Sequence, residues 1–233
     1  MQKPNEKQGV EDVNASEKIN EFIQKNRKPI FITAVSLLLI LVAAIAAVSL
    51  MDVFRKRAIA AVEELNDRYE TILPSITEEY FADDVNSLLD ELTGFAKKHS
   101  GYAGGRAWLL IGGIHAAKKE WAEAETAYAS AAKSAGKIYL APIAWFNAAA
   151  AAEEQGKTAE ALEYYGSSLT TQAVFSSAPR AQFSVGRLHE TLNENEKAVE
   201  AYRAVISGWP HDQIWTNLAR SRIIALEAKT GGE

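Results

Sequence analysis

Residues 108–131 read WLLIGGIHAAKKEWAEAETAYASA, which is the pattern of two helices packed against each other. Large side chains at Trp108 and His115 flank the small Gly112 at helical spacing, and Ala124 and Tyr128 follow after a short break. Small residues let two helix backbones approach closely, while large residues fill the seam on either side. The stretch therefore predicts a helix hairpin.

The alanine–tyrosine pair of the second helix recurs twice, each time after 37 residues. The three pairs are Ala124 and Tyr128, Ala161 and Tyr165, and Ala198 and Tyr202. A fixed period of this size is typical of repeat architectures, in which each unit packs against its neighbours. We expect three hairpin units, at residues 105–138, 142–175 and 179–212.

These units resemble the tetratricopeptide repeat, a helix–turn–helix of about 34 residues with the pattern W-x2-L-G-x2-Y, then A-x3-F-x2-A, then P. The first unit keeps W-x2-I-G-x2-H and A-x3-Y-x2-A, with Gly136 where proline is usual. The second keeps its tryptophan, and the third has Gln182 where tryptophan is usual. Three-residue joints between the units also depart from the spacing of the family.

The resemblance implies which residues hold the hairpins together. These packing residues are Trp108, Gly112, Ala124, Tyr128, Trp145, Ala161, Tyr165, Gly186, Ala198, Tyr202 and Pro210.

The resemblance also implies a groove along the first helix of each unit, where members of the family bind other proteins. The groove residues are Arg106, Leu109, Ile143, Phe146, Arg180, Phe183 and Arg187. Apolar groups with arginines suit a partner helix or an extended peptide that carries a carboxylate. The Lys/Asn carboxylate clamp of some family members is not present at these positions. Alternatively, Phe146 and Phe183 pack against neighbouring helices, because aromatic residues at helical spacing usually belong to the core.

Residues 29–51 form a stretch of 23 residues without a charge, between Lys28 and Asp52. As a helix this stretch would reach about 35 Å, enough to cross a hydrocarbon core of about 30 Å. We therefore expect a transmembrane helix in contact with the lipid bilayer. Two other interpretations remain: a buried helix of a soluble protein, which seldom lacks charge over this length, and a cleaved signal peptide ending near Ala44-Ile45-Ala46.

Basic residues flank this segment on both sides, so the positive-inside rule is nearly balanced. They are Lys25, Arg27 and Lys28 before it, and Arg55, Lys56 and Arg57 after it. A short tail before one hydrophobic segment usually stays inside, while a long domain is translocated. We expect a single-pass protein of the bacterial inner membrane, with a cytoplasmic N-terminus and a periplasmic C-terminal domain. Residues 1–28 form a polar tail, of which residues 1–14 are expected to be disordered.

For residues 52–104 we expect connecting and N-capping helices before the repeats. Apolar residues continue one helix from 54 to 73, and Pro74 ends it. A second apolar stripe runs from 85 to 96, and we expect Ser100-Gly101 and Gly104-Gly105 to stop it. Residues 213–233 predict a C-capping helix and a short tail, because repeat arrays need caps on their end faces.

Composition and motifs argue against chemistry or nucleic-acid binding. The chain has 25 Lys and Arg against 30 Asp and Glu, a net charge of −5, whereas nucleic-acid binding needs a basic face. It has no cysteine, which excludes disulfides and thiolate metal sites. No phosphate loop, nucleophile elbow or dinucleotide fingerprint is visible. No metal-ligand spacing occurs among the four histidines, His99, His115, His189 and His211. We expect no cofactor, no metal and no enzymatic activity.

The sequence as a whole predicts an all-α chain: one transmembrane helix, then an α-solenoid of about three tetratricopeptide-like hairpins with capping helices. This order of parts resembles the bacterial family of ancillary Sec translocon subunits, whose array faces the periplasm and contacts chaperones and emerging chains. The resemblance implies an adaptor in protein export or envelope biogenesis that binds a chaperone, a translocon component or a translocating chain. The alternative is a structural component of the division or envelope machinery that assembles with itself as a homo-oligomer.

Overall fold

The computed structural model describes residues 17–170 and 175–230, and within them every regular element is helical. This confirms the predicted all-α class, a helical array that follows one long apolar helix. The stretch predicted to be disordered, residues 1–14, lies outside the described residues, as does the predicted tail 231–233. The chain divides into two compact units, residues 1–56 and 57–233.

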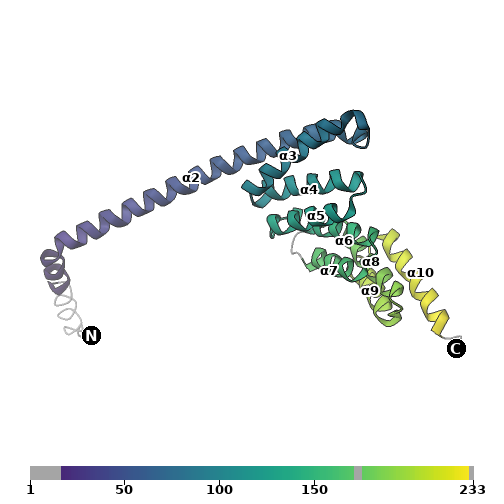
Figure 1. Cartoon of the computed structure of the whole chain (residues 1–233). Helices are drawn as coiled ribbons and strands as arrows, with labels where there is room; N and C mark the ends of the chain where they lie inside the picture. The colour runs from purple at the N-terminus through teal and green to yellow at the C-terminus, as the bar shows by residue number, and fades with distance from the viewer. Residues whose placement is uncertain (1–16, 171–174, 231–233) are drawn as a thin grey trace, which may run out of the picture. The chain divides into compact units, whose positions relative to one another are not determined.

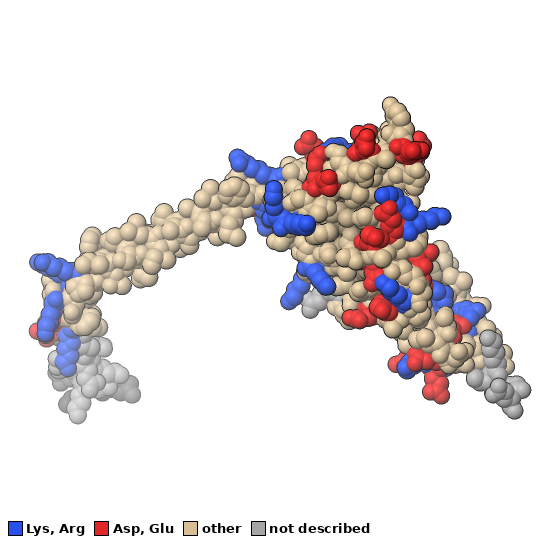
Figure 2. All heavy atoms as spheres, in the orientation of Figure 1, with Lys and Arg blue, Asp and Glu red and all other residues tan. Residues whose placement is uncertain are grey.

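The first unit is dominated by an apolar helical stretch whose large side chains are not buried by any of the described residues. Residues 17–25 are helical, and α2 (Arg27–Ile72) begins directly afterwards. Every large apolar side chain between residues 29 and 51 is exposed. Figure 2 shows this stretch without acidic or basic side chains, and with basic side chains beyond its ends. The helix is long and apolar enough to cross a membrane, and none of its apolar window is buried, unlike the core helix of a soluble protein.

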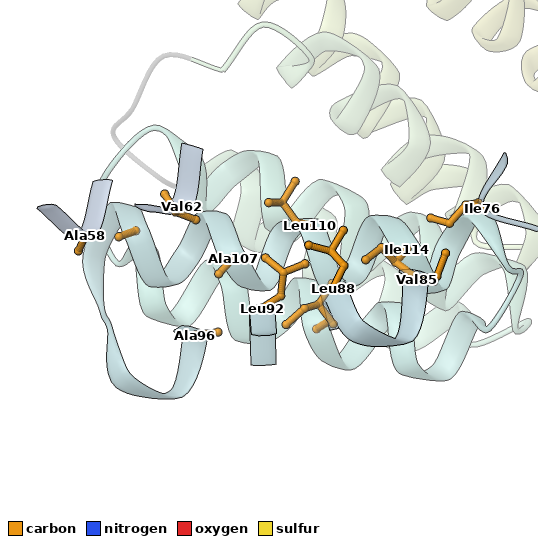
Figure 3. Packing of buried hydrophobic residues seen from close by; sticks show 13 residues of the cluster. Ala58, Val62, Ile76, Val85, Leu88, Leu92, Ala96, Ala107, Leu110 and Ile114 are labelled. Carbon is orange, nitrogen blue, oxygen red and sulfur yellow. The ribbon is translucent and has the colours of Figure 1, made fainter. Parts of the chain in front are cut away.

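The second unit opens with a three-helix core. The last part of α2, residues 57–72, is followed by the short 3-10 turns Leu73–Ser75 and Glu79–Phe81 and by α3 (Ala82–Lys98). Pro74 lies in the first of these turns, as predicted. Val62 on α2, Leu88 and Leu92 on α3, and Ile114 on the next helix are fully buried against one another (Figure 3). An apolar side chain of this size stabilises the fold by about 1.5–3 kcal/mol when it is buried.

The repeats follow as helix pairs that stack in chain order (Figure 1). The first hairpin is α4 (Gly101–Ala117) with α5 (Trp121–Ala135), the second is α6 (Leu140–Glu154) with α7 (Thr158–Thr170), and the third is α8 (Ala178–Thr191) with α9 (Asn195–Gly208). The helix α10 (Gln213–Thr230) comes last. One alanine of each first helix has no exposed surface, which lets the neighbouring helices approach: Ala107, Ala144 and Ala181.

The turn inside each hairpin has the same backbone conformation. Lys119, Gly156 and Asn193 are 37 residues apart, and all three have positive φ angles, of 61°, 71° and 58°. Glycine adopts this left-handed conformation without steric cost, and asparagine tolerates it better than most residues. The turn is therefore fixed by position in the repeat, even where the sequence offers a lysine.

The helix α3 ends at Lys98, just before Ser100-Gly101, as predicted, but the role predicted for Gly104-Gly105 is wrong. Gly104 and Gly105 were expected to stop the preceding helix, but both lie inside α4, which begins at Gly101. They are needed for close packing, because a Cβ on Gly104 would collide with the backbone of His99. A Cβ on Gly105 would lie 3.1 Å from the side chain of Ala135. The first hairpin accordingly begins four residues before the predicted unit.

Candidate protein-binding surface

Each hairpin is closed by a tyrosine of its second helix, which lies against a small residue of its first helix. A Cβ on Gly112 would lie 2.5 Å from the ring of Tyr128, and a Cβ on Gly186 would lie 2.6 Å from the ring of Tyr202. The second hairpin has Ala149 at this place, with no exposed surface. The small residues thus set the separation of the two helices, at the seam where the sequence pattern had put them.

The other predicted packing residues also lie between helices, with the exception of Pro210. Ala124, Ala161 and Ala198 have no exposed surface. Trp108 and Trp145 are half-buried against a cluster of alanines shared by the first two hairpins. Pro210 is exposed in the turn that follows α9.

The second hairpin carries a glutamate that connects three helices. Glu153, in the last turn of α6, accepts a hydrogen bond of 2.7 Å from the hydroxyl of Tyr165 on α7. The same carboxylate forms an ion pair with Arg187 on α8. Burial, together with the bond to Glu153, raises the pKa of the Tyr165 hydroxyl above its ordinary value of 10. The predicted groove residue Arg187 is thus already neutralised within the chain.

The third hairpin repeats this arrangement. The hydroxyl of Tyr202 on α9 donates to Glu190 of α8 at 2.5 Å, and Glu190 pairs with Arg222 on α10. Burial and the bond to Glu190 likewise raise the pKa of Tyr202. We name this tyrosine–glutamate–arginine set a rung, and the second and third hairpins have one each.

The first hairpin has no such rung. The places of the glutamate and the arginine, 37 residues earlier, are taken by Ala116 and Ala150. Its closing tyrosine, Tyr128, lies near Tyr69 of α2 instead, and burial raises the pKa of Tyr128 to about 12, with a smaller contribution from Tyr69. A Cβ on Gly113 would lie 2.7 Å from the Tyr69 hydroxyl. The end of α2 therefore covers part of the first hairpin.

The predicted groove residue Arg106 also faces α2. Its Nη2 donates to Asn66 Oδ1 at 2.8 Å, and the amide of Asn66 donates to Glu70 at 3.0 Å. The Nε of Arg106 is buried and has no hydrogen-bond partner among the described residues. Arg106 consequently fixes α4 to α2, and little of its guanidinium is left for a ligand.

Three predicted groove residues come together where the second hairpin meets the third. Phe146 is 9% exposed, and its ring centroid is 5.4 Å from that of Tyr165. The guanidinium of Arg180 lies over this ring at 5.2 Å, a cation–π arrangement. Arg187 is close by, on the same helix as Arg180. Phe146 is thus a packing residue, as the alternative interpretation held, and the exposed side chain above it is Arg180.

The remaining groove residues are separated from this cluster. Leu109 is half-buried among the alanines of the first and second hairpins. Ile143 is half-buried near the start of α6. Phe183 lies between Tyr202 and Trp215 of α10, and its ring centroid is 5.1 Å from that of Tyr202 and 5.4 Å from that of Trp215. The seven residues therefore do not form one continuous apolar groove, and Arg180 is the one that presents an accessible charge without a carboxylate partner among the described ion pairs.

The rung glutamates, Glu153 and Glu190, stand at groove positions of the repeat, but neither they nor Arg222 are among the seven residues predicted to bind a partner. A signal for them exists, because Glu153 and Glu190 are 37 residues apart, as are Tyr165 and Tyr202. Arg222 follows Arg187 by 35 residues, so strict alignment at 37 misses it.

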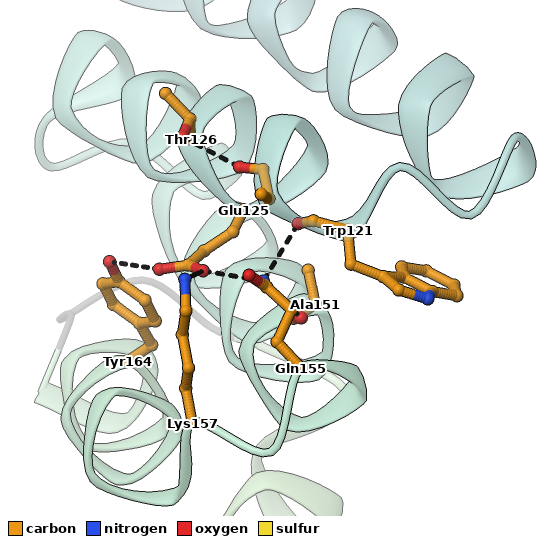
Figure 4. Close-up of polar contacts among 8 residues, drawn as sticks. Trp121, Glu125, Thr126, Ala151, Gln155, Lys157 and Tyr164 are labelled. Atoms are coloured by element: carbon orange, nitrogen blue, oxygen red, sulfur yellow. Dashed lines mark hydrogen bonds and ion pairs between the residues drawn. The ribbon is translucent and has the colours of Figure 1, made fainter.

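A second polar cluster joins the first hairpin to the second (Figure 4). The carboxylate of Glu125 on α5 is buried and accepts hydrogen bonds from Gln155 and Lys157, both at 2.8 Å, and from Tyr164 at 3.2 Å. The amide of Gln155 also donates to the carbonyl of Trp121 at 3.1 Å. Burial alone would raise the pKa of Glu125, but the bonds from Lys157 and Gln155 outweigh it and lower the pKa below 4.5.

The Glu125 cluster predicts a pH-dependent contribution to stability. A carboxylate whose pKa is lowered by folding stabilises the fold above its unfolded pKa, and this stabilisation is lost as pH falls through the folded pKa. We expect Glu125→Gln to lower the free energy of unfolding by about 1.5–3 kcal/mol at pH 7, and by clearly less well below pH 4.5. Thermal melts of both proteins at pH 7 and pH 3.5 measure the difference. The control is Glu123→Gln, at an exposed position of α5; an equal loss at both pH values for Glu125→Gln would contradict the prediction.

Among the described residues, no polar cluster has the arrangement of a metal site. They contain no group of three or more His, Asp or Glu placed to hold a metal ion. An open hollow of about 420 Å³ lies between the end of α2 and α3, away from the predicted groove, and its lining is mainly charged: Glu64, Asp67, Arg68, Thr71, Ile72 and Asp84. The most prominent structural features of the described residues are therefore the polar and aromatic contacts between neighbouring helices.

Comparison with protein families agrees with the paired helices. Models of the tetratricopeptide repeat match residues 89–137, 121–173 and 179–207. Residues 89–173 and 179–207 are therefore similar to tetratricopeptide repeats. The first match begins inside α3, so the tetratricopeptide signal starts before the first predicted unit. Proteins built from such repeats are generally non-enzymatic scaffolds, and the repeats imply a role in protein–protein interaction.

A curated protein is similar in sequence to part of the chain. The chain is 38% identical over 131 residues to a TPR repeat-containing protein of Treponema pallidum (strain Nichols). The alignment covers 56% of this chain and 54% of the relative, so the chain spans about half of that protein's length.

Proposed function

We propose that this protein is a membrane-anchored adaptor that recruits another protein in protein export or envelope biogenesis. The tetratricopeptide repeats supply the interaction role, and the uncharged, fully exposed stretch 29–51 supplies the anchor. The predicted groove residues lie at several separate contacts between helices. We therefore place the binding site where the second hairpin meets the third. The single observation behind this choice is Arg180, an exposed guanidinium held over the ring of Phe146. A chaperone, a translocon component or a translocating chain with a carboxylate and apolar groups suits this site.

Anchoring is tested by fractionation of a bacterial host that produces the full chain. We expect the chain to stay with the membranes after an alkaline wash, and its measured mass to include residues 1–46. Leu41→Arg, within the uncharged stretch, is expected to release a large share of the chain into the soluble fraction, because a charge at the centre of a span costs about 3 kcal/mol. Loss of residues 1–46 from the wild-type mass would instead identify a cleaved signal peptide.

Topology is tested with spheroplasts of the same host. Protease added outside is expected to digest the repeats and to leave the N-terminal tail intact. Protection of the repeats in intact spheroplasts, with digestion only after lysis, would overturn the periplasmic location and the export role with it.

The binding site is tested by photo-crosslinking from position 180 in isolated membranes. Arg180 suits this experiment better than Phe146, because Phe146 is almost completely buried. We expect adducts with one or a few proteins of the export or envelope machinery. The control is a crosslinker at Lys133, an exposed position on α5. The same adducts from both positions, or adducts only with copies of this chain, would reject the adaptor site.

Charge reversal at the same place separates binding from folding. Arg180→Glu is expected to weaken binding of the captured partner roughly two- to tenfold, as loss of an exposed charge pair does. The melting temperature should fall only slightly, through loss of the exposed cation–π contact with Phe146. Arg187→Glu serves as the contrast, because it places a second carboxylate against Glu153 and is expected to destabilise the repeats. Unchanged affinity for Arg180→Glu would remove this residue from the site.

A further inference from the structure

The last helix, α10, has the residue pattern of a first helix of a hairpin. Thr216, at 2% exposure, continues the series of fully buried residues formed by Ala107, Ala144 and Ala181. Arg222 pairs with Glu190 as Arg187, 35 residues earlier, pairs with the preceding glutamate. The two helices therefore correspond at these two positions, at a spacing of 35.

The equivalence shows which face of α10 would receive a second helix. Several residues of α8 contact α9 or the residue before it: among them, Gln182 donates to the carbonyl of Ala201 at 3.3 Å, Gly186 lies against Tyr202, and His189 Nδ1 is 2.6 Å from Glu194. Their counterparts in α10, 35 residues later, are Asn217, Ser221 and Ile224. All three counterparts are exposed. Within the described residues, α10 is thus a first helix without its second helix.

The open face of α10 is uncharged. It carries Ile214, Asn217, Leu218, Ser221, Ile224, Ala225 and Ala228, which share one side of the helix and are all exposed. Ile214 is 71% exposed and Ile224 is 67% exposed. The end of a repeat array normally needs a polar outer face to stay soluble, and an exposed apolar patch marks an interaction site. The composition of this face is that of a seam, with small residues beside large ones.

We propose that α10 of a second copy lies antiparallel on this face, so that each α10 takes the place of the other's missing second helix. The direction agrees with the hairpins, whose two helices run antiparallel. The charges favour a copy of this chain over an unrelated helix, because Arg220 and Glu227 lie two turns apart on the same edge of the face. In an antiparallel pair, Arg220 of each copy faces Glu227 of the other. Glu227 is held in place by Arg203 of α9, at 3.3 Å.

This self-association is independent of the proposed adaptor role, because it uses α10 and leaves Arg180 exposed. The two proposals can therefore fail separately. An adaptor that is dimeric through α10 would present two binding sites.

Disulfide crosslinking tests the interface directly, because the chain has no native cysteine. Ile224→Cys, next to the midpoint between Arg220 and Glu227 where the two copies of α10 cross, is expected to form a covalent homodimer on mild oxidation of isolated membranes. Ser207→Cys, at an exposed serine of α9, is the matched control and is expected to stay monomeric. Equal crosslinking of both variants, or adducts of Ile224→Cys only with a different protein, would overturn the proposal.

Sedimentation of the full chain in mild detergent provides the second test. We expect a dimer, and Ile224→Glu is expected to raise its dissociation constant roughly tenfold or more, equivalent to about 1.4 kcal/mol. Arg220→Glu and Glu227→Arg should each weaken the dimer, and the double variant should recover part of the loss. Because these residues are exposed, the melting temperature of Ile224→Glu should equal that of the wild type. A monomer at all concentrations, or a dimer that none of these variants weakens, would refute the interface.

Discussion

Leu92→Ala is expected to lower the free energy of unfolding of the second compact unit, residues 57–233, by about 2–5 kcal/mol. Leu92 has no exposed surface and lies in the core shared by the end of α2, α3 and α4. Truncation leaves a cavity that the surrounding helices fill only in part, so the lost packing adds to the lost burial. Because each repeat is stabilised by its neighbour, loosening this core also weakens the first hairpin.

Tryptophan fluorescence during urea unfolding measures this effect without interference from the apolar helix. All five tryptophans, Trp108, Trp121, Trp145, Trp209 and Trp215, lie in the second unit. The control is Leu192→Ala, at a leucine that is 45% exposed in the turn after α8, where we expect less than about 1 kcal/mol. Similar losses for both leucines would show that α3 does not belong to the cooperative core.

Gly186→Ala is expected to destabilise the third hairpin by about 1–3 kcal/mol, the usual cost of forcing extra volume into a packed site. A Cβ at this position would lie 2.6 Å from the ring of Tyr202. The ring has little room to move, because its hydroxyl donates to Glu190 and its face contacts Phe183. The added methyl therefore pushes α8 and α9 apart and disturbs the rung that connects them to α10.

Gly166→Ala is the matched control, with the opposite expected sign. Gly166 is in the middle of α7, and a Cβ there meets nothing within 4 Å. Alanine is the better helix former, so this variant is expected to gain up to about 1 kcal/mol. The same fluorescence-detected urea unfolding compares the two substitutions. If both changes stabilised the protein, helix propensity would dominate and the proposed clash at the seam would be refuted.

The hairpins could be predicted from the sequence because their signals are local. A glycine one turn from a tryptophan, followed by an alanine–tyrosine pair, requires only helical periodicity to be interpreted. Gly104 and Gly105 misled the prediction for a related reason. Glycine marks both helix ends and close helix contacts, and the two cases differ only in what lies next to the missing Cβ. Here that neighbour is the backbone of His99, which the periodicity does not show.

The candidate site was less predictable because its contacts connect different hairpins. Arg187 and Glu153 are 34 residues apart, and their pairing depends on how one hairpin stacks on the next. Phe146 illustrates the same point: its position in the repeat indicated a groove residue, yet Arg180 of the next hairpin lies over its ring. The missing rung of the first hairpin is visible in the sequence as two alanines, but its consequence depends on where the end of α2 packs.

The sequence by itself determined the helical class, the apolar stretch 29–51, the 37-residue period and the small–large seam inside each hairpin. These features follow from hydrophobic periodicity and side-chain size along single helices. Only the tertiary structure decided which charged groove residues are already paired, that Arg180 remains accessible, and that no second helix packs on α10 within the described residues. Those properties depend on distances between helices, which are set by how each hairpin packs against the next.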